Sequence, residues 1–128
     1  MIEKCQLVKD FECFPGGDLT ELGERGVNLS GGQKARISLA RAVYADREII
    51  LMDDPVSALD KNVLKKIFED LLLKELAGKT RILVSHCVDY LPVFDKIILL
   101  KRGRVVQIGK YSELKRNFFL QKLMKIHK

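Results

Sequence analysis

Residues 29–33, Leu-Ser-Gly-Gly-Gln, combine a hydroxyl group with two residues that have no side chain. The bare backbone at Gly31 and Gly32 lets an anion come close, and the free amides at a helix start carry about half a positive charge. A phosphate group is the expected ligand. The alternative is an ordinary helix start after a glycine turn, because Ser30 is a favoured capping residue and Gln33 stands at the capping-box spacing.

A second group of polar residues follows two apolar runs. Asp53 and Asp54 stand at the end of residues 48–53, and His86 comes directly after residues 80–85. If both runs are parallel strands, these side chains lie beyond the carboxyl ends, where open parallel sheets bind ligands. Asp53 is suited to hold Mg²⁺ through water, and Asp54 can orient or deprotonate an attacking water. The alternatives are two aspartates that simply meet solvent and a histidine with a structural role.

Helices and strands alternate among the elements that must position these residues. Ser30 begins a helix, and Asp60 caps a second helix that Gly78 ends. Residues 48–53 and 80–85 are continuous apolar runs, typical of parallel strands buried on both faces. Strand, helix and strand in this order predict a right-handed parallel crossover. The apolar stripe of the second helix consists of Leu64, Ile67, Phe68, Leu71 and Leu72.

The start of the chain is expected to hold one short helix. Residues 1–13 form it, and the breakers Phe-Pro-Gly-Gly at residues 14–17 end it. From there to residue 29 the chain is glycine-rich, and we expect irregular structure.

The carboxyl-terminal part predicts a hairpin followed by a helix. After a short helix that breaks near Pro92, residues 96–100 and 105–108 are the strands of a hairpin, and Gly103 supplies the turn. Residues 111–128 have a basic amphipathic pattern, from which we expect one terminal helix that starts at about Ser112.

Composition favours a soluble domain without a nucleic-acid partner. Apolar residues make up 47% of the 128 residues, and no apolar run approaches the roughly 20 residues of a membrane-spanning helix. The net charge of +6 comes from basic residues that are scattered along the chain, so solvated helix faces account for them. The three cysteines show no metal-ligand spacing, which indicates reduced thiols in a cytosolic setting.

The motifs, taken in order, resemble a known family. Residues 29–33 are similar to the signature motif of ATP-binding-cassette (ABC) nucleotide-binding domains. Residues 49–54 resemble the Walker B strand of that family, residues 57–60 resemble its D-loop, and His86 falls at the place of its switch histidine. Residues 26–28, Asp54-Pro55 and residues 79–86 are similar to the first nucleotide-binding domain of subfamily C, the multidrug-resistance-associated transporters.

The resemblance implies the fold class and its organisation. The chain is expected to be the carboxyl-terminal half of a P-loop NTPase domain, an α/β fold in which helices flank parallel core strands and a hairpin follows. Residues 1–29 would end the helical subdomain and lead to the signature motif. Residues 30–110 would run from the signature helix to the hairpin, and residues 111–128 would be the terminal helix.

The resemblance also implies a role for each motif. In the family two such domains pair head to tail, so Ser30, Gly31 and Gly32 would contact the terminal phosphate of ATP held by the other domain, with Gln33 supporting them. This domain's own ATP would be served by Asp53 as the Mg²⁺ ligand and by Asp54 and His86 as catalytic residues. Asp60, in the D-loop, would communicate between the two domains.

Position 54 departs from the family pattern. Most hydrolytic members have glutamate where this chain has Asp54, and aspartate is shorter by one methylene group. The carboxylate is thus withdrawn by about 1.5 Å. Since a misplacement near 1 Å lowers a rate about a hundredfold, we expect slow hydrolysis at this site.

The 128 residues contain no Walker A phosphate loop. Gly78-Lys79-Thr80 imitates its end, but the required first glycine would fall at Leu73, and the segment ends a helix instead of opening one. We therefore expect the isolated chain to bind ATP weakly or not at all. Without the strands of the missing half, the apolar edges and faces of both core strands should be bare and should favour aggregation.

The resemblance implies ATP binding and hydrolysis coupled to transmembrane transport, in the export direction. The expected partners are the amino-terminal half with Walker A, a second nucleotide-binding domain and membrane-spanning domains. The expected location is the cytoplasmic face of a membrane, within an integral transporter. The alternatives are a regulatory ATP-sensing domain with little turnover, for which Asp54 is the main evidence, and a soluble ABC ATPase outside transport.

Overall fold

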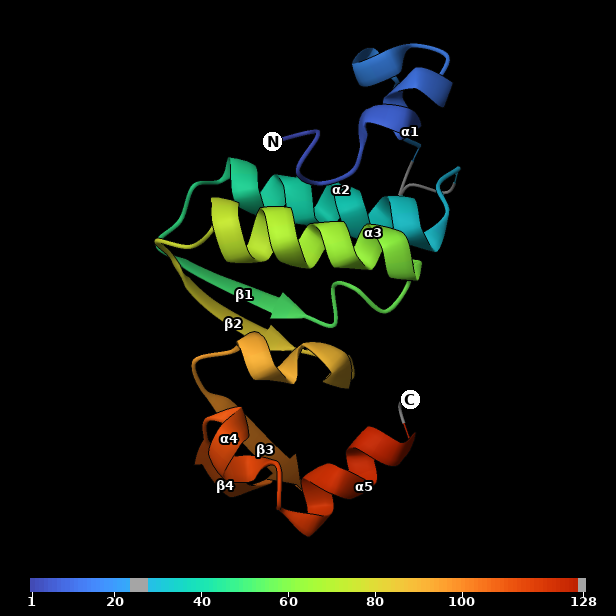
Figure 1. Ribbon diagram of the computed structural model, residues 1–128. Helices are drawn as coiled ribbons and strands as arrows, with labels where there is room; N and C mark the ends of the chain where they lie inside the picture. The colour runs from blue at the N-terminus through green and yellow to red at the C-terminus, as the bar shows by residue number, and fades with distance from the viewer. Residues whose placement is uncertain (24–27, 127–128) are drawn as a thin grey trace. The chain divides into compact units, whose positions relative to one another are not determined.

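The computed structural model describes residues 1–23 and 28–126 of the chain. These residues fall into two units, Met1–Ser85 and His86–Lys128, and each unit has a two-stranded sheet (Figure 1). Strands pair in parallel in the first unit and antiparallel in the second, and helices accompany both, which confirms the expected α/β class. Gly26 and Val27, which belong to the subfamily resemblance, lie outside the described residues.

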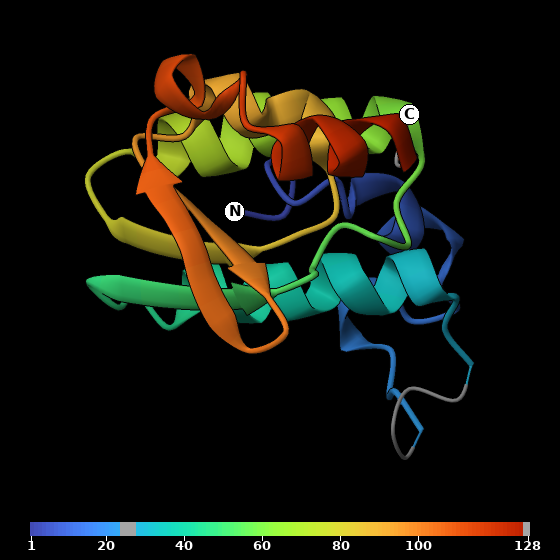
Figure 2. The same cartoon turned by 90° about the horizontal axis from the view of Figure 1, so that it is seen from below.

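The first unit contains the parallel crossover that the sequence predicts. Its elements are α1 (Val8–Cys13), η1 (Gly17–Leu19), α2 (Gly31–Tyr44), β1 (Ile49–Asp53), α3 (Lys61–Lys66), η3 (Ile67–Glu75) and β2 (Thr80–Val84). β1 and β2 are parallel neighbours, with Ile49 opposite Thr80 and Asp53 opposite Val84. Figures 1 and 2 place α2 and the α3–η3 helix on the same side of this sheet. The pairing puts the carboxyl ends of β1 and β2 at one edge.

The sheet of β1 and β2 is covered on one face only. Ile50 and Met52 of β1 are buried, whereas Leu51 is 72% exposed and its partner Ile82 is 54% exposed. The prediction that both strands are buried on both faces is therefore wrong for this chain. The expectation of bare apolar faces is confirmed for the first unit, because Leu51 and Ile82 are exposed there.

The helix that follows Asp60 changes its winding halfway along. Asp60 caps α3 as the sequence predicts, but Ile67–Glu75 continue as a π-helix, in which the Leu76 amide donates to the Leu71 carbonyl at 3.0 Å. The Arg81 guanidinium of β2 donates to the Leu72 carbonyl and so joins η3 to the sheet. The expected apolar stripe forms the core of the unit, where Ile67, Phe68, Leu71 and Leu72 are buried and Leu64 is half-buried.

The predicted helix over residues 1–13 is shorter than expected. The Cys5 amide donates to the Met1 carbonyl in a separate first turn, and Gln6 then has a φ of 57°. A left-handed residue cannot continue a right-handed helix, so α1 begins only at Val8. Cys5 is nevertheless fully buried.

The second unit contains η4 (Val88–Val93), β3 (Ile97–Lys101), β4 (Arg104–Gly109), α4 (Tyr111–Leu114) and α5 (Phe118–Ile126). β3 and β4 form the predicted hairpin, with Lys101 opposite Arg104. Arg102 and Gly103 both have positive φ, of 50° and 72°, as a tight two-residue turn requires. Pro92 lies inside η4, the short 3₁₀-helix that the sequence places there.

The carboxyl-terminal segment forms two helices, so the prediction of one helix over residues 111–128 is wrong. The Asn117 side chain accepts hydrogen bonds from the amides of Phe119 and Leu120, at 2.8 and 3.1 Å, and so starts a new helix after a break. The new helix buries Leu120 and leaves Phe118 82% exposed. The core of this unit consists of Ile97, Leu99, Leu114 and Leu120.

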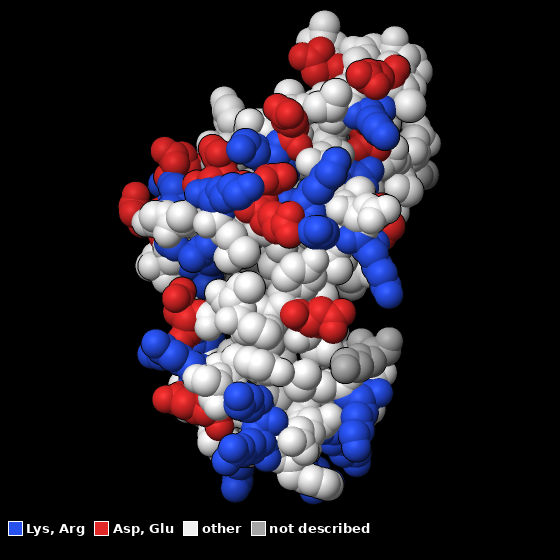
Figure 3. All heavy atoms as spheres, viewed as in Figure 1, with Lys and Arg blue, Asp and Glu red and all other residues white. Residues whose placement is uncertain are grey.

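Charge is distributed differently in the two units. Acidic and basic side chains are interspersed over α2 and α3, whereas basic ones predominate over the second unit (Figure 3). The exposed basic residues of that unit include Lys101, Arg102, Arg104, Lys110, Lys115, Arg116, Lys122 and Lys125. Among the described residues, no helix is both long enough and apolar enough to span a lipid bilayer.

Candidate functional site

The start of α2 has the predicted capping box. The Ser30 hydroxyl oxygen accepts a hydrogen bond from the Gln33 amide at 3.2 Å, and the Gln33 side-chain oxygen accepts one from the Ser30 amide at 2.9 Å. Within the described part of the chain, the amides of Gly31 and Gly32 have no acceptor. Two N–H groups at the positive end of a 14-residue helix thus remain available, and such groups fit a phosphate.

The segment Ser57–Asp60 lies beside this helix start. A methyl group on Gly32 would lie 3.1 Å from the Ala58 carbonyl oxygen, and one on Gly31 would lie 3.5 Å from the Ala58 side chain. Only glycine fits the first of these positions without a shift of its neighbours. The structure thus brings the signature-like and D-loop-like residues together, although they are separated by a helix and a strand.

Asp60 has a local structural role. One of its carboxylate oxygens accepts hydrogen bonds from the amides of Asn62 and Val63, both at 3.0 Å, and these bonds cap α3. The cap explains why aspartate is suited to this position. Communication with a second domain through Asp60 stays a prediction.

Asp53 and Asp54 lie together at the carboxyl end of β1. Asp53 is exposed, and Asp54 has a φ of 44°, in the left-handed region that few residues other than glycine adopt. Two hydrogen bonds hold this turn: the Asp54 amide donates to the Val84 carbonyl at 2.8 Å, and the Ser57 hydroxyl donates to the Asp54 carbonyl at 3.2 Å. A strained backbone that its neighbours hold in place is common at functional sites.

Asp53 and Asp54, at the carboxyl end of β1, can supply part of the oxygen ligands that Mg²⁺ needs. The described residues contain no cluster of three or more His, Cys, Asp or Glu side chains that could hold a metal ion by themselves. Proteins commonly bind Mg²⁺ through one or two carboxylates, with water and phosphate oxygens completing the shell. Asp53 can supply one such carboxylate.

His86 follows β2 by two residues and its side chain is exposed. It is the first residue of the second unit, whereas Asp53 and Asp54 belong to the first. A joint action of this histidine with the carboxylates stays a prediction.

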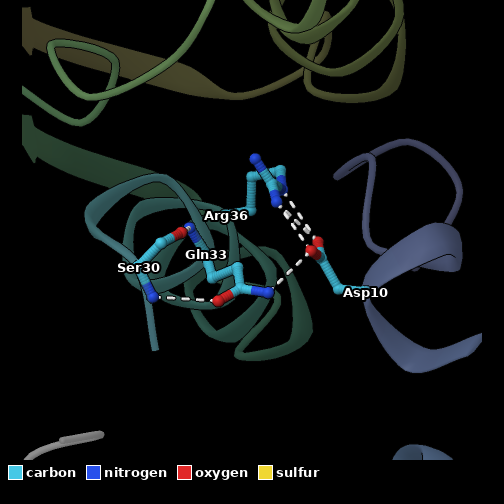
Figure 4. A network of polar contacts seen from close by, with 4 residues as sticks. All are labelled: Asp10, Ser30, Gln33 and Arg36. Carbon is cyan, nitrogen blue, oxygen red and sulfur yellow. Dashed lines mark hydrogen bonds and ion pairs between the residues drawn. The ribbon is translucent and has the colours of Figure 1, made fainter. Parts of the chain in front are cut away.

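A buried ion pair joins α1 to the start of α2 (Figure 4). The Arg36 guanidinium contacts both carboxylate oxygens of Asp10, with Nε to Oδ2 at 3.0 Å and Nη2 to Oδ1 at 2.8 Å. The Gln33 side-chain nitrogen donates to the same carboxylate at 3.1 Å. Side-chain exposure is only 13% for Arg36 and 11% for Asp10. Gln33 therefore bridges the ion pair and the Ser30 amide.

Sequence reasoning missed Asp10 and Arg36. The available signal is the position of Asp10, three residues after Leu7; the structure buries both of these residues, and Asp10 is the buried residue of α1. A carboxylate on a buried face requires a partner, which indicates a cation elsewhere in the chain. The identity of that cation, 26 residues away, does not follow from local patterns.

A cavity of about 430 Å³ lies between the start of the chain and α2. Its lining is mainly apolar and includes Met1, Ile2, Leu7, Phe11, Ile37 and Tyr44. Apolar walls do not suit a phosphate, so this cavity is not a candidate anion site.

Comparison with known proteins gives consistent relatives. A family model described as ABC transporter matches residues 9–57. ATP-binding cassette sub-family C member 3 of Rattus norvegicus is 54% identical over 115 residues, which are 88% of this chain and 8% of that protein. The Homo sapiens protein of the same description has the same identity and coverage. ABC transporter C family member 9 of Arabidopsis thaliana is 50% identical over 127 residues, which are 98% of this chain and 8% of that protein. The chain thus spans about 8% of the length of these curated relatives.

Proposed function

Because this chain belongs to the ABC transporter family, and its relatives to subfamily C, we propose that it forms part of a nucleotide-binding domain. The complete protein binds and hydrolyses ATP and couples hydrolysis to export of a solute across a membrane. The observation that carries this proposal is the pair of open amides at Gly31 and Gly32, placed beside residues 57–60. Taken alone, residues 30–32 would be explained by an ordinary capped helix start.

In this proposal the chain contributes to two nucleotide sites. The amides of Gly31 and Gly32, with the Ser30 hydroxyl, bind the terminal phosphate of ATP held by a second domain. Asp53 serves the domain's own nucleotide as a Mg²⁺ ligand, and Asp54 orients the attacking water. Bound Mg²⁺ neutralises charge on the phosphate oxygens. His86 adds a polar contact to the terminal phosphate of the domain's own ATP.

The proposal requires partners that the 128 residues do not contain. These residues contain no phosphate loop, so a loop from outside them must hold the nucleotide. A second nucleotide-binding domain must present its own ATP to α2, and membrane-spanning domains must carry the solute. The chain then acts at the cytoplasmic face of the membrane, and by itself it neither binds ATP tightly nor hydrolyses it.

Asp54 favours a second candidate, a regulatory domain that closes on ATP with little turnover. Its carboxylate is one methylene shorter than that of glutamate, and the left-handed backbone fixes the point from which it extends. Restoring the longer side chain distinguishes the two candidates, since only a competent site gains turnover.

The open amides can be tested with two glycine substitutions in the complete transporter. In Gly31→Ala the new methyl group makes an ordinary contact with Ala58 at 3.5 Å, so folding is preserved while the approach of a phosphate is obstructed. Gly78→Ala is the matched control, because nothing lies within 4 Å of its new methyl group. We expect Gly31→Ala to lower ATP turnover about a hundredfold, and Gly78→Ala to leave it within about twofold.

The free energy of unfolding, measured in urea, should change by less than about 0.5 kcal/mol in both variants. Unchanged turnover in a folded Gly31→Ala protein would refute a role for these amides in phosphate binding.

A further inference from the structure

We propose that Asp10 is a positioning residue for the phosphate-binding end of α2: through Gln33 and Arg36 it fixes the orientation in which the amides of Gly31 and Gly32 meet a phosphate. This inference rests on the function proposed above. Asp10 lies on α1, outside every motif that the family resemblance includes, and it is 8% exposed.

The first step concerns the side-chain amide of Gln33. Its oxygen accepts from the Ser30 amide at 2.9 Å, and its nitrogen donates to Asp10 at 3.1 Å. If this amide group turned over, its oxygen would face a carboxylate oxygen and its nitrogen would face an N–H group, and both contacts would be repulsive. Asp10 therefore determines that the Gln33 oxygen faces Ser30, which keeps the capping box closed.

The second step concerns the guanidinium of Arg36. Two of its nitrogens, Nε and Nη2, bind the Asp10 carboxylate. The third, Nη1, lies beside the signature glycines, because a methyl group on Gly32 would be 3.4 Å from it. A two-pronged ion pair fixes the plane of a guanidinium as well as its position. Asp10 therefore fixes the Arg36 guanidinium with its Nη1 next to Gly32.

The two steps together tie α2 to α1 at two successive positions on one face, Gln33 and Arg36. Residues three apart on a helix lie on the same side, so the carboxylate binds both at once. With two attachments the direction of the first turn is set as well as its position.

Substitutions that move the negative charge from position 10 to position 33 distinguish this arrangement from an ordinary capping box. In an ordinary capping box, glutamate at the third position serves as well as glutamine. Here Gln33→Glu would set a carboxylate against Asp10. Adding Asp10→Asn restores a donor opposite Glu, so the double variant should recover what Gln33→Glu loses.

The measurement is amide hydrogen exchange by NMR in the full 128-residue chain. The amides of Ser30 and Gln33 report the capping box, and those of Asp54 and Thr80, which bond to the Val84 and Glu48 carbonyls, report overall stability. We expect Asp10→Asn and Gln33→Glu to speed exchange at Ser30 and Gln33 about tenfold relative to the two reference amides. The double variant should return within about threefold of the unmodified chain.

Glu12→Gln is the matched control, because it removes an exposed carboxylate from the same helix. It should leave exchange at Ser30 unchanged. The proposal is overturned if Gln33→Glu exchanges as slowly as the unmodified chain, if the double variant shows no recovery, or if Glu12→Gln has the same effect. Equal acceleration at all four amides would also overturn it, since Asp10 would then support only overall stability.

Steady-state kinetics of the complete transporter provide the functional readout. Asp10→Asn should lower kcat for ATP about tenfold and leave KM within about twofold, because this site's ATP is held mainly by the other domain. Equal kcat values for the Asp10→Asn and unmodified proteins would overturn the inference. If the unmodified transporter hydrolyses no ATP, the proposed function fails, but the exchange measurement still decides whether Asp10 positions the start of α2.

Discussion

Replacing Asp54 with glutamate should raise ATP turnover and lower stability at the same time. Asp54 stands at the carboxyl end of β1 with a φ of 44°, and its backbone N–H donates a hydrogen bond to the Val84 carbonyl at 2.8 Å that fixes the backbone there. Only the length of the side chain then decides how far the carboxylate reaches. Asp54→Glu changes this length and leaves the charge unchanged.

The size of both effects follows from the geometry. One additional methylene group advances the carboxylate by about 1.5 Å. Since a misplacement near 1 Å lowers a rate about a hundredfold, the gain in turnover should be of that order. Glutamate tolerates left-handed backbone less well than aspartate does, so the free energy of unfolding should fall by about 0.5–1 kcal/mol.

The assay is phosphate release by the complete transporter at saturating ATP, together with urea unfolding of the 128-residue chain. Asp54→Asn is the matched control, because asparagine tolerates the left-handed backbone but lacks the negative charge. It should leave turnover at or below that of the unmodified protein. A folded Asp54→Glu protein with unchanged turnover would refute the argument from side-chain length and favour the regulatory candidate.

Further predictions concern the rest of the chain. Burial raises the pKa of the Cys5 thiol to about 11, so at pH 8 Cys5 should react with a maleimide far more slowly than the exposed Cys13; equal rates would contradict this. Because the folded pKa is raised from 9.0, the stability that this thiol contributes is complete below pH 9 and should be lost as pH rises towards 11 in urea titrations. Leu51→Lys should reduce light scattering by the chain and change the free energy of unfolding by less than about 0.5 kcal/mol; a larger loss would mean that the exposed face is packed. Asn117→Ala should lower that free energy by about 1 kcal/mol in urea unfolding, and no change would show that the cap is not needed.

Local patterns account for the parts of the fold that the sequence predicted. The capping box of Ser30 and Gln33 depends on residues three apart, and the turn at Gly103 depends on two adjacent residues. The parallel pairing of β1 with β2 follows because a helix separates two apolar runs. In each case the structure follows from a local pattern or from the order of such patterns along the chain.

The parts that sequence reasoning missed depend on contacts between distant residues or on competing local choices. Asp10 and Arg36 meet only after α1 and α2 pack. The exposure of Leu51 depends on which other segments are present to cover the sheet. Near the carboxyl end, the amphipathic pattern continues past Asn117, but the side chain of that residue caps a new helix instead of continuing the old one. Hydrophobic periodicity cannot resolve this competition.

The same limit applies to the candidate site. The sequence identified Ser30–Gln33 and the two aspartates, and the structure adds that Gly32 contacts residues 57–60 and that Asp54 has a left-handed backbone. Neither fact has a signature in the sequence, since an isolated aspartate or glycine is compatible with many conformations. The structure therefore adds the geometry from which the effects of substitutions can be estimated.

The most direct test of the proposed site is labelling of the complete transporter with an ATP analogue that carries a photoreactive group on its terminal phosphate. We expect Mg²⁺-dependent labelling of the peptide that contains residues 29–33, and loss of this label in Gly31→Ala but not in Gly78→Ala. Efficient labelling of the transporter that leaves residues 29–33 unmodified would contradict the proposal that this end of α2 binds the phosphate of ATP.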